Sequence, residues 1–181
     1  MLFITHILIT NYLYQIVAYH GYTDMEMGIS AAIAAVMEIP ILFGFTRINK
    51  KISSGTLLKI SGLFFTLRTA LILIATDIGM IYFAQTMQLF GFGLYTGACV
   101  YYVDHTIEEE HRVQGQTCIA LTNTIGSLVG SFFGGMILDS FSVPGMLIIG
   151  VIAGAFGTVL LFLFAEKGKK ADDCSEVGKT V

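Results

Sequence analysis

Charged residues are scarce in this sequence. Only 13% of its 181 residues are Asp, Glu, Lys or Arg, whereas 55% are hydrophobic, and the mean hydropathy is +0.76. A soluble domain usually draws about a quarter of its residues from the charged types to build a polar surface. Most of this chain's surface must therefore face lipid, which predicts a membrane protein with the lipid bilayer as a partner. No basic stripe or row of stacking aromatics indicates nucleic-acid binding.

Motifs for metal, cofactor or enzymatic chemistry are missing as well. The cysteines and histidines show no ligand spacing; they are Cys99, Cys118, Cys174, His6, His20, His105 and His111. Small buried thiols are the simpler interpretation of Cys99 and Cys118. The sequence contains no GxSxG, no HExxH and no phosphate-binding glycine loop. We therefore expect no metal, no cofactor and no enzymatic activity.

Six long apolar segments follow one another, at residues 1–18, 26–46, 54–75, 78–102, 115–138 and 143–165. About 20 apolar helical residues are needed to cross the hydrocarbon core of a bilayer. The segments are continuous and lack the alternation of membrane strands, so helices are expected. The sequence predicts an all-α membrane protein with a six-transmembrane-helix bundle over residues 1–166. Residues 167–181 are poor in apolar residues and are expected to form a disordered cytoplasmic tail.

The basic residues predict an orientation. Nine of the ten lie at or beside alternate loops: Arg47, Lys50, Lys51, Lys59, Arg112, Lys167, Lys169, Lys170 and Lys179. The intervening loops carry only acids. Lys and Arg are retained on the cytoplasmic side during insertion, so both termini are expected in the cytoplasm and the chain in the plasma membrane. The first span begins at Met1 without a polar lead, which favours a truncated chain or a partial gene product.

Arg68 and Glu38 are charged residues inside apolar spans. Arg68 lies about 21 Å, and Glu38 about 12 Å, from the cytoplasmic end of its helix at the usual rise per residue. An ionisable group at such depth usually faces a cavity or a partner. Across the gap of roughly 9 Å, the pair could form a salt bridge or enclose water or a solute. Alternatively, Arg68 snorkels outward, or Glu38 is protonated and bonds a neighbouring helix, because burial disfavours the charged carboxylate.

Two sets of polar residues share spacings that place each set on one helix face. They are Asn11, Tyr14 and Gln15 on the first span, and Gln85, Gln88 and Tyr95 on the fourth. Amides avoid lipid, so both faces should point inward. Hydrogen bonds between helices explain any single member most simply. Their occurrence together with Glu38 and Arg68 favours a polar central cavity.

Glycine and proline positions predict how the helices pack. Gly126, Gly130 and Gly134 repeat every four residues, as do Gly150 and Gly154. Small residues at this spacing allow helix backbones to approach closely. Pro40 removes a backbone hydrogen bond and should kink the second span near residues 36–38.

Several stretches carry a resemblance to a known family: residues 28–40 (GISAAIAAVMEIP), 47–51 (RINKK), 65–68 (FTLR) and 114–116 (QGQ). With them the chain resembles the C-terminal six-helix half of a major facilitator superfamily transporter, over nearly all of residues 1–166. The subgroup it is most similar to contains lactose permease and its nucleoside-transporter relatives. The resemblance implies alternating access between two six-helix halves. It therefore implies a missing N-terminal half or a second copy of this chain as partner.

The chain departs from the lactose-permease pattern at one functional face. In that group, the arginine at the place of Arg68 works with a charged face one helix later to couple proton and sugar movement. The positions that align with this face are Gln85, Gln88 and Gly91, and none of them titrates. Glu38 is then the remaining candidate for a proton carrier.

Three functional hypotheses remain open. The first is a secondary transporter of a small solute, with proton coupling through Glu38 and Arg68 as the partner of the solute or of Glu38. The second is the six-span substrate-binding component of an ATP-driven vitamin importer, which tight ligand binding by the chain alone would favour. The third is a non-transporting scaffold or remnant.

Overall fold

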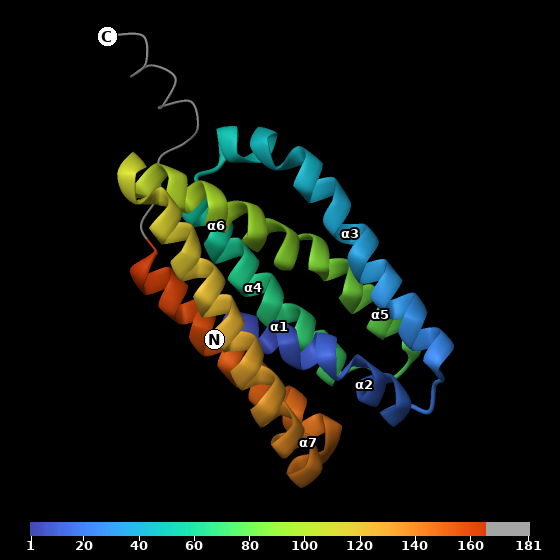
Figure 1. Cartoon of the computed structure of the whole chain (residues 1–181). Helices are drawn as coiled ribbons and strands as arrows, with labels where there is room; N and C mark the ends of the chain where they lie inside the picture. Colours follow the sequence, from blue (N-terminus) through green and yellow to red (C-terminus); the bar gives the residue numbers. More distant parts are fainter. Residues whose placement is uncertain (166–181) are drawn as a thin grey trace, which may run out of the picture.

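The computed structural model describes residues 1–165, except for the side chains of Leu42, His105 and Thr106. This part of the chain contains helices and no strand, which confirms the all-α prediction. The helices are α1 (Leu2–Asn11), α2 (Leu13–Tyr19), α3 (Asp24–Lys51), α4 (Ser54–Leu73), α5 (Ile78–Thr86), α6 (Phe92–Thr106) and α7 (Arg112–Phe164), with 3₁₀ turns η1 (Met87–Leu89) and η2 (Glu109–His111) (Figure 1). The predicted cytoplasmic tail, 167–181, lies outside the described residues.

Several predicted spans are interrupted helices. α1 and α2 meet at a bend of 60°, and α3 bends by 54° between Asp24–Ile41 and Phe43–Lys51. α3 is therefore bent, but the bend lies between Ile41 and Phe43 and not near residues 36–38, where Pro40 was expected to kink the helix. By length and composition, two helices within residues 1–165 could cross a membrane, Ser54–Leu73 and Glu109–Phe164, or up to four if each bent pair is one span. The count of six spans stays a prediction.

The helix α7 consists of two arms that run side by side in opposite directions (Figure 1). They meet at Ser142, whose φ of 59° and ψ of −178° are not helical. Pro144 lies two residues further on, and proline disfavours the helical conformation in the residue before it. The two arms correspond to the fifth and sixth predicted spans.

Side chains at the first turns explain where α3 and α5 begin. Thr23 and Glu26 form a capping box, in which the Thr23 backbone N–H donates to the Glu26 carboxylate at 3.0 Å. The carboxylate of Asp77 accepts from the backbone N–H of Met80 at 2.8 Å. Each bond satisfies a backbone donor that the first turn of a helix leaves free.

The glycine repeats of α7 lie at close helix contacts, as predicted, and α1 is one of the helices they meet. A Cβ added to Gly130 would lie 3.2 Å from Ile7 of α1, and one added to Gly154 would lie 3.4 Å from Thr5. Both glycines are buried. The two arms of α7 therefore contact α1 through backbone surfaces that have no side chain.

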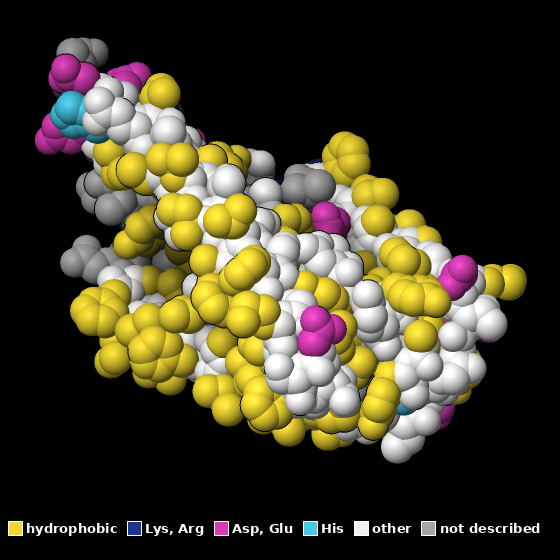
Figure 2. Space-filling view, turned by 60° about the horizontal axis from the view of Figure 1, so that its bottom comes forward, with side chains coloured by type: hydrophobic (Ala, Val, Ile, Leu, Met, Phe, Trp, Pro, Cys, Tyr) yellow, Lys and Arg dark blue, Asp and Glu magenta, His cyan; other side chains and the backbone are white. Residues whose placement is uncertain are grey.

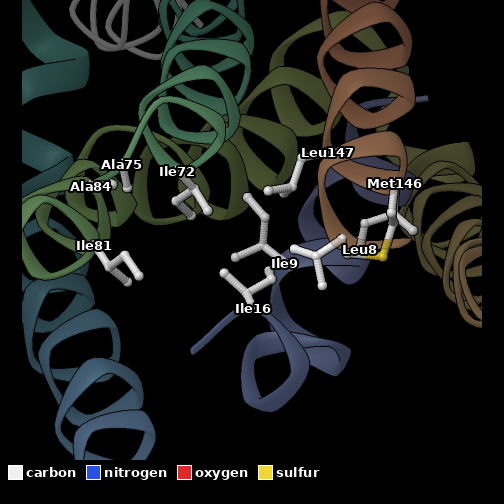
Figure 3. Close-up of a cluster of buried hydrophobic side chains, with 10 residues drawn as sticks. Leu8, Ile9, Ile16, Ile72, Ala75, Ile81, Ala84, Met146 and Leu147 are labelled. Carbon is white, nitrogen blue, oxygen red and sulfur yellow. The ribbon is translucent and has the colours of Figure 1, made fainter. Parts of the chain in front are cut away.

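Two apolar clusters form the core. The first joins α1, α2, α4, α5 and the second arm of α7, through Leu8, Ile9, Ile16, Ile72, Ile81, Ala84, Met146 and Leu147 (Figure 3). The second joins α3, α4 and α6, through Ile41, Phe45, Leu57, Leu58, Leu94, Ala98 and Cys99. Many large hydrophobic side chains are also exposed, and they cover much of the face shown in Figure 2. A surface of this kind fits lipid contact.

Candidate functional site

Arg68 lies inside the bundle on α4, with only 3% of its surface exposed. Its Nη1 donates to the side-chain oxygen of Gln88 on η1, and its Nη2 donates to that of Gln85 on α5. The Nδ1 of His6 on α1 lies 3.5 Å from Nη1. The side chain therefore bonds inside the bundle and does not snorkel outward.

The two glutamines carry the network from Arg68 to α3. Gln85 Nε2 donates to Ser30 Oγ at 2.9 Å, and Gln88 Nε2 donates to Glu38 Oε1 at 2.7 Å. The Gln88 side chain thus spans the gap between Arg68 and Glu38, with its oxygen toward the cation and its nitrogen toward the carboxylate. The Gln88 amide therefore lies between Arg68 and Glu38, where the sequence suggested a direct salt bridge, a water molecule or a solute.

The turn η1 explains why both amides reach one guanidinium. α5 ends at Thr86, and the chain continues as a 3₁₀ turn over Met87–Leu89. Side chains three residues apart eclipse one another when the helix tightens in this way. Gln85 and Gln88 therefore converge on Arg68.

A cavity of about 290 Å³ lies beside this network, and we call it the Arg68 cavity. Its wall consists of His6, Thr10, Leu13, Met27, Ala31, Ala34, Ala35, Glu38, Arg68, Gln85 and Gln88. The charged and amide groups form a polar end. The three alanines of α3, with Leu13 and Met27, form an apolar wall.

The sequence pattern of the Major Facilitator Superfamily matches residues 1–178. The chain belongs to the Major Facilitator Superfamily. This is a family of secondary transporters and not of enzymes, so the chain is a membrane protein of a transport family. No curated protein and no solved structure matches the chain.

Within this facilitator-superfamily chain, four of the predicted site residues meet and four do not. Glu38, Arg68, Gln85 and Gln88 line the Arg68 cavity. Asn11, Tyr14, Gln15 and Tyr95 are not among its lining residues. The bend between α1 and α2 breaks the first predicted face, and the break at Gly91 separates Tyr95 from the two glutamines.

The four other residues have different surroundings. Asn11 Nδ2 donates to Ser131 Oγ at 2.7 Å, and 48% of Tyr14 is exposed. Gln15 Oε1 is buried and has no hydrogen-bond partner among the described residues. Tyr95 donates to Asn123 Oδ1 at 2.8 Å and borders two cavities of about 230 and 240 Å³.

His6 and Ser30 are members of the network that the sequence interpretation missed. His6 is 7% exposed and stacks on Phe92, with ring centroids 4.5 Å apart and an angle of 11° between the rings. Its position within an apolar stretch was the available signal, because ionisable residues inside spans usually have a partner. Ser30 gave no comparable signal.

A larger hollow of about 720 Å³ lies on the first arm of α7. Its lining is Thr124, Ser127, Leu128, Val129, Ser131, Phe132 and Phe133. None of these side chains titrates near neutral pH, whereas the Arg68 cavity combines a carboxylate, a guanidinium and an imidazole. We therefore take the Arg68 cavity as the candidate site. Among the described residues, no group of three or more His, Cys, Asp or Glu could hold a metal ion.

Proposed function

We propose that this chain is the C-terminal six-helix half of a proton-coupled transporter that moves a small solute by alternating access. Glu38 carries the proton, and Arg68 is the partner of the solute. The observation that carries this proposal is the Gln88 bridge between Glu38 and Arg68 at the wall of the Arg68 cavity.

Its charge distinguishes Glu38 from the other residues of the cavity. It is the one carboxylate among the described residues that line the cavity, and Gln85 and Gln88 cannot titrate. Protonation of Glu38 removes a negative charge that is separated from Arg68 only by the side-chain amide of Gln88. Electrostatic interactions are strong in a low-dielectric interior. Proton occupancy of Glu38 therefore changes how strongly Arg68 attracts a solute.

The proposal includes a second six-helix unit, either a missing N-terminal half or a second copy of this chain. Tyr14 supports it, because it is 48% exposed and lipid would leave its hydroxyl without a good partner. The face that carries Tyr14 would border the second unit and the aqueous path. We also propose plasma-membrane insertion with both termini cytoplasmic, and descent from the lactose-permease-like and nucleoside-transporter-like subgroup without its charged coupling face.

Replacement of Glu38 tests the coupling role. We expect Glu38→Gln to abolish solute accumulation driven by an imposed proton gradient, because the amide cannot gain or lose a proton. Exchange of labelled for unlabelled solute should persist. The measurement is uptake by the complete transporter in sealed vesicles, with Glu110→Gln, an exposed acid outside the cavity, as the matched control.

Proton-driven accumulation that survives in Glu38→Gln would show that Glu38 is not the carrier. Normal insertion of the complete protein without transport or ligand-induced stabilisation would favour a non-transporting remnant instead.

A further inference from the structure

We propose that the Arg68 cavity binds the carboxylate of a small monoanionic solute with an apolar body, and that one proton on Glu38 accompanies each solute. This inference rests on the proposed function and specifies the class of solute that the site takes.

The partners of Arg68 indicate a preference for an anion. Nη1 and Nη2 donate to two uncharged amide oxygens, and Nε is buried without a hydrogen-bond partner among the described residues. A buried guanidinium normally contacts an anion directly, because neutral groups compensate its charge incompletely. Glu38, the carboxylate of the cavity wall, is one amide away.

Arg68 already uses two N–H groups toward acceptors, as it would in a contact with a carboxylate. A carboxylate places its two oxygens on two guanidinium N–H groups in a bidentate contact, which is both stronger and more directional than a bond between neutral groups. Gln85 and Gln88 supply two separate oxygens to Nη1 and Nη2. A solute carboxylate would therefore displace the amides from Arg68 and take over both contacts.

The rest of the wall indicates an apolar body with few hydroxyl groups. Ala31, Ala34 and Ala35 form a smooth surface on α3, next to Leu13 and Met27. Apart from Arg68 Nε, several polar groups nearby already have partners: the Thr10 hydroxyl donates to the His6 carbonyl at 3.0 Å, and both glutamine nitrogens donate within the network. A sugar needs many free donors and acceptors, and this wall offers few.

Charge balance explains the accompanying proton. A carboxylate on Arg68 neutralises the guanidinium and leaves the half-buried carboxylate of Glu38 without a compensating positive charge. Glu38 restores neutrality when its carboxylate takes one proton from water and becomes a carboxylic acid. One monoanion and one proton then cross together, and no net charge moves.

The other titratable groups around Glu38 bear on its pH response. His6 from α1 and Arg68 from α4 line the same cavity. Of the elements packed against α3, α2 contributes Leu13, α5 and η1 contribute the two glutamines, and α6 contributes no lining residue within the described chain. Glu38 and His6 are therefore the two groups whose protonation a pH experiment must separate.

Matched acids and amides test the solute class on the complete purified transporter. Butyrate and benzoate should bind at least about tenfold more tightly than butyramide and benzamide, because only the acids form the charged bidentate contact. The measurement is the shift of thermal unfolding with ligand concentration in detergent. The readout is the ratio of acid to amide affinity and not the affinity itself. Equal binding of acid and amide, or binding of neither, overturns the proposal.

Variants assign the contact to Arg68 and the proton to Glu38. Arg68→Lys keeps the positive charge but removes the planar guanidinium that makes the bidentate contact. It should reduce acid binding about tenfold. Lys59→Gln on the same helix should leave acid binding unchanged. Binding of the acids to the wild-type protein should weaken between about pH 6 and about pH 8. The dissolved acids are ionised over this whole range, so their own ionisation does not cause the change. Glu38→Gln should remove this pH dependence. A pH dependence that persists in Glu38→Gln belongs to His6 and contradicts the proposal.

The two proposals can fail separately. If the acids do not bind but proton-driven uptake by the complete transporter still requires Glu38, the carboxylate assignment is wrong and the proposed function stands. If the acids bind through Arg68 but uptake ignores the proton gradient, the site is correct and the coupling is wrong.

Discussion

Gln88 holds two charged side chains together without a charge of its own. Its amide accepts from Arg68 at one end and donates to Glu38 at the other. It is 3% exposed, so water cannot readily replace either bond. An apolar residue of similar size would leave the guanidinium and the carboxylate each short of a partner.

We expect Gln88→Leu to lower the free energy of unfolding by about 1–3 kcal/mol, the usual cost of an unsatisfied buried polar group. The measurement is reversible unfolding of the purified chain in detergent. Gln15→Leu is the matched control, because it removes a buried oxygen that already lacks a partner among the described residues. That control should be neutral or stabilising. Equal losses in both variants would show that the Gln88 bridge adds no stability.

The packing of α7 against α1 depends on glycines of α7. A Cβ added to Gly134 would lie 2.6 Å from Leu8 and 2.6 Å from the ring of Tyr12. The Tyr12 hydroxyl also donates to the Ser131 carbonyl, which restricts how far the ring can move. The close contact of α7 with α1, which carries His6 of the network, therefore requires glycine here.

Gly134→Ala should accordingly lower the free energy of unfolding by about 1–3 kcal/mol, the typical cost of overpacking. Gly28→Ala on α3 is the control, because a Cβ there meets nothing within 4 Å. Alanine also favours helix over glycine, so the control should be neutral or slightly stabilising. Thermal unfolding of both variants in the same detergent compares them. An unchanged Gly134→Ala would mean that α1 and α7 have room to separate.

At the scale of the whole molecule, the exposed surface has two kinds of face. Ile148 on the second arm of α7 is 48% exposed, as is Tyr14 on α2. Lipid accommodates the first side chain and not the hydroxyl of the second. The Tyr14 face should therefore border water or a second six-helix unit.

Cysteine labelling of the complete transporter in vesicles checks this arrangement. With Cys118 and Cys174 replaced by Ser, we expect Tyr14→Cys to react at least about tenfold faster with a water-soluble maleimide than Ile148→Cys, because the reactive thiolate requires water. The equal exposed fractions make the two positions a matched pair. Faster labelling at Ile148→Cys would place the aqueous path on the other side of the bundle.

Some features of the fold and of the site were predictable because they depend on local composition. Long apolar runs require helices in lipid, and glycine repeats permit close contact wherever they occur. Arg68 and Glu38 were identifiable because a charge inside an apolar run is costly. The convergence of Gln85 and Gln88 was predictable in part, since residues three apart share a face. Tyr95 lines other cavities than the two glutamines do, because the helix does not continue through Gly91 as the spacing rule assumes.

The sequence by itself determined the class of the molecule and its candidate charged residues, since hydrophobicity and charge belong to each residue wherever it lies. Only the tertiary structure decided how these residues meet. The breaks between α1 and α2 and between η1 and α6 set which polar side chains point together. The orientation of the Gln88 amide and the approach of His6 depend on partners up to 62 residues apart in the chain. Such contacts form only when separate helices pack, and no spacing along one helix contains them.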